Sequence, residues 1–246
     1  MKTLFKKSNN NSNNTYRSYL MAAAGVLMFN FGGMTGAEAA QTLHKTITVQ
    51  DQEVFYREAG VGNKKTIVLL HGFPTSSHMY RDLIPKLSEQ YHVIAPDYPG
   101  FGNSSMPSLN EFEYSFDNLA KVTDSFLQKV GAEEYTMYVM DYGAPIGFRI
   151  AAAHPERVQG LIIQNGNAYD EGLRDFWDPI KAYWKDKSPE NAKKLKDSLL
   201  TIGATEWQYT FGTRNKETIS PDNWIVDQAK LDRPGNKEIQ LELFHS

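Results

Sequence analysis

A carboxylate stands at a point of the sequence where an apolar strand gives way to a helix. The stretch VMDYGAPIG, residues 139–147, places Asp141 at the tip of a sharp turn, with Gly143 and Gly147 just beyond it. These glycines let the turn pass close to neighbouring backbone. Aspartate has a pKa of about 3.9 in water, so it is an anion at pH 7 and needs no base. It can attack an sp³ carbon that bears a leaving group, which forms an ester on the protein.

A structural role for the same aspartate is the alternative, because aspartate before a helix commonly caps it. Two further turns favour the catalytic role: HGFP at residues 71–74 and DYPGFG at residues 97–102. We predict that the Asp97 side chain stabilises its own turn by accepting hydrogen bonds from backbone N–H groups. His71 is predicted to orient the loop that follows it, and not to transfer protons.

Backbone N–H groups near Asp141 are predicted to bind the oxyanion that forms when the ester is hydrolysed. The candidates are the amide of Tyr142, directly after the aspartate, and the amide of Phe73, directly after His71 and Gly72. Preorganised amides of this kind stabilise developing negative charge. Because the backbone supplies these N–H groups, the role requires no particular side chain at either position.

The elements that must position these residues alternate along the chain. Polar and apolar residues alternate over 44–58, which predicts an antiparallel hairpin. Continuous apolar runs predict buried strands at 66–70, 92–96, 135–140 and 158–164. Helical spacing predicts helices at 78–90, 115–130 and 144–154. This alternation predicts an α/β fold with a mostly parallel sheet flanked by helices, and ligand sites in such sheets lie beyond the carboxyl ends of the strands. His71, Asp97 and Asp141 all fall at such ends.

Three regions of the chain differ in composition. Residues 1–39 combine a basic start, a short apolar stretch and an A-x-A arrangement ending at Ala39, which indicates a secretory signal peptide; an uncleaved anchor is the alternative. Residues 40–165 carry the predicted α/β core. Residues 166–246 show helical spacing and many aromatic residues, which predicts a helical cap over the site.

The segments HGFPTSSHMYRDLIPKL, VIAPDYPGFGNSS and YVMDYGAPIGFRIAAAHPERV together resemble the α/β-hydrolase fold. The branch they resemble is that of haloalkane dehalogenases and epoxide hydrolases, in which the nucleophile of the turn is an aspartate. The resemblance implies a hydrolase that acts on small apolar epoxides or alkyl halides through an ester at Asp141. It covers residues 44–165 strongly and the predicted cap loosely.

The resemblance favours an epoxide over a halide. Dehalogenases of this branch bind the halide with a Trp after the nucleophile and often an Asn at the position of Phe73, whereas this chain has Tyr142 and Phe73. Epoxide hydrolases use tyrosine hydroxyls of the cap to protonate the epoxide oxygen, and Tyr169, Tyr183 and Tyr209 are the candidates here. Packing of an amphipathic ring is the alternative role for each of them.

The second half of the reaction needs a histidine oriented by an acid, which the family carries after its last strands. The sequence ends at LELFHS inside the predicted cap, and QNGN after the last predicted strand holds no acid. We therefore expect a C-terminally incomplete hydrolase with its last strands missing. A non-catalytic binding protein on the same fold is the alternative, and the absence of a serine at the turn disfavours a serine esterase.

The composition of the chain limits the kinds of ligand and binding partner that it can have. The chain has 246 residues, no cysteine and a net charge of −3, which excludes disulfides and thiolate metal sites and disfavours nucleic acid. We expect a small apolar substrate, no cofactor and no metal ion. We also expect an exported, periplasmic or secreted protein without stable membrane insertion; the sequence leaves the oligomeric state open.

Overall fold

The structure, a computed structural model, describes residues 41–246 of the chain. The predicted signal peptide lies outside the described residues. Among the residues that are described, no helix combines the length and the apolar character needed to cross a bilayer.

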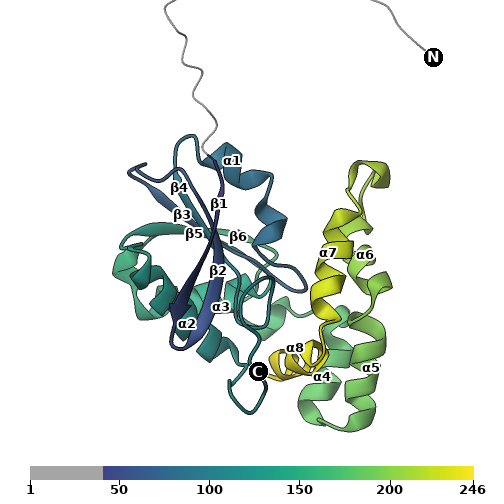
Figure 1. The fold of residues 1–246 in the computed structure, drawn as a ribbon. Helices are drawn as coiled ribbons and strands as arrows, with labels where there is room; N and C mark the ends of the chain where they lie inside the picture. Colours follow the sequence, from purple (N-terminus) through teal and green to yellow (C-terminus); the bar gives the residue numbers. More distant parts are fainter. Residues whose placement is uncertain (1–40) are drawn as a thin grey trace, which may run out of the picture. The chain divides into compact units, whose positions relative to one another are not determined.

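One mixed sheet of six strands forms the centre of the structure (Figure 1). Its strands are β1 Leu43–Val49, β2 Gln52–Ala59, β3 Thr66–Leu70, β4 His92–Pro96, β5 Tyr135–Met140 and β6 Val158–Gln164. The spatial order is β1-β2-β4-β3-β5-β6, in which β1, β2 and β4 pair antiparallel and β4, β3, β5 and β6 pair parallel. The predicted hairpin, the four predicted strands and the mostly parallel sheet are thereby confirmed.

Alternate residues of β3 and β4 pack into two separate hydrophobic cores, one on each face of the sheet. Val68, Leu70 and Ile94 point to the face that packs against α2 (Phe116–Lys129) and α3 (Gly143–Ala153). Ile67 and Val93 point to the other face, together with Ile84 of the short helix α1 (Leu83–Leu87). Since successive side chains of a strand point to opposite faces, a continuous apolar run marks a strand that is buried on both sides.

The helix expected over residues 78–90 is shorter than predicted. It is divided into a 3₁₀ turn, η1 Ser77–Tyr80, and α1, Leu83–Leu87. Pro85 lies at the third position of α1, and a proline has no N–H to bond to the carbonyl four residues earlier. The turn that precedes it is therefore not continued into one long helix.

Helices alone follow β6 in the described part of the chain. They are α4 Asp178–Lys185, α5 Pro189–Leu199, α6 Ile202–Thr210, α7 Asp222–Leu231 and α8 Asn236–His245, with short 3₁₀ turns between them. This helical region is attached to the loop after β4, because Arg233 and Asn236 donate hydrogen bonds of 2.9 and 2.7 Å to the carbonyl of Gly100.

Strand β6 lies at the edge of the sheet with apolar side chains in solvent. Leu161, Ile162 and Ile163 are 41%, 49% and 52% exposed. In residues 41–246 this edge pairs only with β5. An exposed apolar edge can pair with another chain, so it is a predicted site of aggregation.

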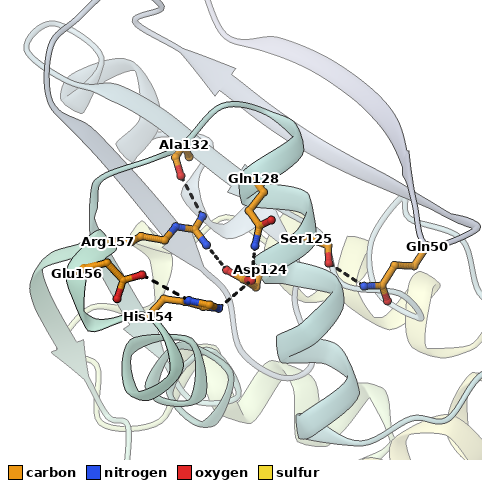
Figure 2. Close-up of polar contacts among 8 residues, drawn as sticks. All are labelled: Gln50, Asp124, Ser125, Gln128, Ala132, His154, Glu156 and Arg157. Carbon is orange, nitrogen blue, oxygen red and sulfur yellow. Dashed lines mark hydrogen bonds and ion pairs between the residues drawn. The ribbon is translucent and has the colours of Figure 1, made fainter.

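A network of charged groups joins α2 to the segment before β6 (Figure 2). The Asp124 carboxylate accepts a hydrogen bond from Arg157, lies 3.3 Å from His154 Nε2 and accepts another bond from Gln128 at 2.7 Å. Arg157 also donates to the carbonyl of Ala132 at 3.1 Å. The side chains of Asp124 and Arg157 are only 15% and 14% exposed, so this histidine has a structural partner and not a catalytic one.

Asp124→Asn is expected to lower the free energy of unfolding by about 1–3 kcal/mol, because it leaves the mostly buried Arg157 without its counter-charge. The matched control is Asp197→Asn, which removes an exposed i,i+4 pair with Lys193 and is expected to change little. Urea unfolding of the two variants measures the difference. Equal losses in both variants would contradict this assignment.

Candidate active site

The turn after β5 presents Asp141 in an unusual backbone conformation. Its φ is +49°, which lies in the left-handed region that residues with a side chain seldom adopt. Helix α3 begins two residues later at Gly143, where an added Cβ would lie 2.3 Å from the carbonyl oxygen of Leu70 in β3. The glycine therefore allows α3 to pack closely on the sheet while the turn lifts Asp141 beyond the strand end.

Two backbone amides hold one oxygen of the Asp141 carboxylate. The N–H of Phe73 donates to Oδ1 at 2.8 Å and the N–H of Tyr142 donates to it at 2.7 Å. The structure thus brings together the predicted nucleophile and both amides that the sequence predicts around it. The second oxygen, Oδ2, receives no hydrogen bond from residues 41–246, so it is the oxygen available for attack on a substrate.

The surroundings of Asp141 act on its pKa in opposite directions. Burial raises the pKa of the carboxyl, and the hydrogen bonds from the Phe73 and Tyr142 amides lower it, with burial the larger effect. Loss of water makes a carboxylate a stronger nucleophile, whereas the two hydrogen bonds stabilise its charge and fix its orientation. Its reactivity requires the ionised form, so we expect it to increase as the pH rises through the raised pKa.

His71 and Asp97 support the site from behind. His71 is fully buried, its ring stacks on Tyr98 with centroids 4.1 Å apart, and burial lowers its pKa, so it stays neutral. Tyr98 N donates to its Nε2 at 3.4 Å, so its Nδ1 carries the proton and donates to the carbonyl of Gly72 at 3.0 Å. Asp97 accepts bonds of 2.7 and 2.8 Å from the amides of Ser77 and Asn103. Both side chains position loops, as their placement in the sequence suggests.

Two cavities meet at Asp141. One has a volume of about 340 Å³, and its wall includes Phe73, Thr75, Trp207 and Tyr209. The other has a volume of about 690 Å³, and its wall includes Tyr142, Tyr169 and Trp177. Apolar and aromatic side chains dominate the wall of the smaller cavity, which suits a small apolar ligand, whereas the larger cavity also has polar residues such as Arg149 and Asn167 in its wall.

The sequence profile of the alpha/beta hydrolase fold matches residues 65–219. The chain belongs to this family. It is 46% identical over 205 residues to an uncharacterized hydrolase of Saccharomyces cerevisiae, an alignment that covers 82% of this chain and 70% of the yeast protein.

Two further comparisons concern the dehalogenase and epoxide hydrolase branch. A haloalkane dehalogenase of Bradyrhizobium diazoefficiens is 37% identical over 106 residues, which cover 43% of this chain and 33% of that protein. A solved structure of the epoxide hydrolase CorEH without ligand shares the fold with a TM-score of 0.66 at 19% identity, over 83% of this chain and 73% of that one. This alpha/beta hydrolase is therefore related to the branch, and the chain spans only part of the length of these proteins.

The three candidate tyrosines lie in different places. Tyr209, on α6, lines the smaller cavity together with Asp141. Tyr169 lines the larger cavity and is 79% exposed. Tyr183, on α4, is 3% exposed, packs its ring against His245 and lines neither cavity in the described structure. The structure therefore does not bring Tyr183 together with Asp141; its placement fits the packing role that the sequence also allowed.

The hydrolase site holds no histidine in the part of the chain that the structure describes. None lines either cavity that Asp141 reaches. His92 pairs with Glu58 at 2.8 Å, and His44 bonds to Arg57 at 2.8 Å. Together with His154 in the Asp124 network, these histidines lie in structural contacts away from the nucleophile.

Asp227 was not predicted from the sequence. It lies on α7, is 1% exposed and accepts a hydrogen bond from the hydroxyl of Tyr209. Burial raises the pKa of Asp227 to about 6. The available signal was its spacing: Leu231 follows four residues later, so Asp227 shares the inward face of the helix.

Asp227 is expected to make stability fall as the pH rises. Because its pKa in the folded state is raised, the folded protein binds the proton more tightly than the unfolded one, and this advantage is lost between about pH 4 and pH 6. Relative to Asp227→Asn, the native protein should lose about 2–3 kcal/mol across this window. Urea unfolding at a series of pH values measures it, with Asp222→Asn, an exposed carboxylate of the same helix, as the control. Parallel profiles for the native protein and Asp227→Asn would contradict the shift.

Proposed function

We propose that this alpha/beta hydrolase acts on small apolar epoxides or alkyl halides through an ester formed at Asp141, with epoxides favoured. The observation that carries the proposal is the state of the Asp141 carboxylate. Its Oδ1 is held by two amides, its Oδ2 receives no hydrogen bond from residues 41–246, and the residue lines two cavities, the smaller of which is mainly apolar.

The first step is an alkylation. Asp141 Oδ2 attacks an sp³ carbon of the substrate, the bond from this carbon to the halide or to the epoxide oxygen breaks, and the leaving atom keeps the electron pair. The product is an ester of Asp141. In the second step water attacks the ester carbonyl carbon and loses a proton to solvent, and the charge that develops on Oδ1 is stabilised by the amides of Phe73 and Tyr142, which already point at that oxygen. The bond from this carbon to Oδ2 then breaks, the alcohol leaves, and the carboxylate of Asp141 is restored.

The position of Tyr209 supports an epoxide as the substrate. When an epoxide opens, its oxygen becomes an alkoxide that needs a proton, and a phenol in the same cavity as the nucleophile can supply one. The exposed Tyr169 borders the larger cavity and is the second candidate donor.

An unpaired hydroxyl supports an alkyl halide as the second candidate substrate. The hydroxyl of Tyr142 is buried and has no hydrogen-bond partner among residues 41–246. Tyr142 lines the larger cavity, and its ring lies among the rings of Phe73, Phe116 and Phe244. A buried donor without a partner costs free energy, and a halide would satisfy it after a movement of the surrounding rings opens the hydroxyl to the cavity.

Product counting separates hydrolysis from binding alone. Purified protein is incubated with hexyl bromide or with hexene oxide, and released bromide and diol are measured per chain. We expect at least one bromide per chain, since alkylation of Asp141 releases it even where ester hydrolysis is slow. A folded protein that releases none would contradict the proposal and would favour a binding protein on this fold.

Export is part of the same proposal. The basic start and the A-x-A arrangement before residue 40 support it. Amino-terminal sequencing of the exported protein is expected to begin at Ala40, and retention of the full leader inside the cell would contradict it.

A further inference from the structure

We propose that Asp227 and Tyr209 form a proton relay, which protonates the oxygen of an epoxide while Asp141 attacks its carbon. The inference rests on the proposed function of Asp141 and extends it to two residues of the helical region. It gives Asp227 a role as a positioning residue and proton source that acts through Tyr209.

The geometry places the acid behind the phenol. Tyr209 lines the cavity of about 340 Å³ that Asp141 also lines, and its hydroxyl bonds to Oδ2 of Asp227. Asp227 is 1% exposed and is not part of that cavity wall in the described structure. A second buried bond joins the two helices, because the Thr205 hydroxyl donates to Gln228 Oε1 at 2.8 Å. Asp227 therefore acts on a ligand through the cavity residues that face it, Tyr209 and Thr75, and of these Tyr209 has the more acidic hydroxyl.

The groups that face Asp227 come from four segments. Burial favours the neutral acid and raises its pKa to about 6. The Tyr209 hydroxyl on α6, the Thr75 hydroxyl after β3 and the charge of Arg81 after η1 lower this pKa, while the charge of Asp97 after β4 raises it. Near neutral pH the pair therefore exists in two states that differ by one proton.

The two states direct the phenol proton differently. When Asp227 is ionised it accepts the Tyr209 O–H, and the proton points away from the cavity. When Asp227 is protonated it donates to the Tyr209 oxygen, which frees the phenol O–H to rotate toward a ligand. Burial and the charge of Asp227 both raise the pKa of Tyr209, so the neutral acid is also the state in which Tyr209 gives up its proton more readily.

The step balances without a further reactant. A bond forms between Asp141 Oδ2 and the epoxide carbon, and the bond from that carbon to the epoxide oxygen breaks. The electron pair stays on the oxygen, which takes the Tyr209 proton, and Tyr209 takes the proton of Asp227. The ester at Asp141 is neutral, so the negative charge moves to Asp227.

Two probes of the same size test the relay, because an epoxide needs a proton and a bromide does not. The initial rate of Asp141 modification is followed by mass spectrometry with hexene oxide and with hexyl bromide. Tyr209→Phe is expected to slow modification by the epoxide about 100-fold, on the scale of general acid catalysis, and to leave the bromide reaction within a few-fold. In the native protein the epoxide rate should fall as the pH rises above about 6, and Asp227→Asn should abolish this fall.

Matched variants control for structural damage. Tyr183→Phe removes the hydroxyl of a buried tyrosine outside both cavities, and Asp222→Asn removes an exposed carboxylate of α7. Both should react with the two probes like the native protein. Equal effects of Tyr209→Phe on the two probes, or a fall above about pH 6 that persists in Asp227→Asn, would overturn the relay alone. No modification by either probe would overturn the proposed function and the relay with it.

Discussion

Asp141→Asn is expected to reduce bromide release from hexyl bromide by about a thousandfold or more, because the substitution removes the only group assigned to attack the substrate. The asparagine keeps an Oδ1 that can accept the Phe73 and Tyr142 amides, and asparagine tolerates a positive φ better than most residues. The change therefore removes the nucleophile and leaves its setting in place. Ion chromatography of released bromide measures the effect.

The control for this variant is its own fold and mass. Its urea unfolding midpoint should stay close to that of the native protein, and its intact mass before the reaction should show that the amide has not hydrolysed back to aspartate. A folded Asp141→Asn protein that releases bromide at the native rate would show that another group attacks the substrate.

Gly72→Ala is expected to have the second-largest effect. A Cβ at residue 72 would lie 2.4 Å from the Cβ of Asp141 and 2.8 Å from its Oδ1, closer than real contacts allow. The carboxylate must then move away from the Phe73 and Tyr142 amides. Displacements of about 1 Å at a reacting group cost roughly 100-fold in rate. Overpacking of this kind also lowers the free energy of unfolding by about 1–3 kcal/mol.

Gly203→Ala is the matched substitution for this test. Gly203 lies in α6, and nothing is within 4 Å of an added Cβ there. Alanine in a helix is favoured over glycine, so this variant should gain up to about 1 kcal/mol and keep its rate of bromide release. Native reactivity in Gly72→Ala would mean that the contact between the two loops does not set the position of Asp141.

The core of the fold was predictable because its signals are local. Strands β3, β4 and β5 are short apolar runs. Each is followed directly by a residue of the site: His71, Asp97 and Asp141. Asp141 was predictable because it is a charged residue between an apolar strand and two glycines. Packing alone explains poorly why a charge stands there. The amides of Phe73 and Tyr142 followed from the same turns, since the roles assigned to them depend on main-chain position.

The helical region was predictable in type but not in detail. Helical spacing shows which face of a helix is apolar, but it does not show which other helix covers that face. Tyr183 and Tyr209 therefore look alike in the sequence, whereas one packs against His245 and the other reaches the cavity. Asp227 was missed for the same reason, because its importance depends on Tyr209, 18 residues away on another helix.

The most direct test of the central claim is the mass of the peptide that contains Asp141 after reaction with hexyl bromide, quenched in acid within the first turnover. We expect a hexyl ester on Asp141, together with one bromide released for each ester formed. Bromide released by a folded protein whose Asp141 stays unmodified, with the hexyl group on another residue, would contradict it.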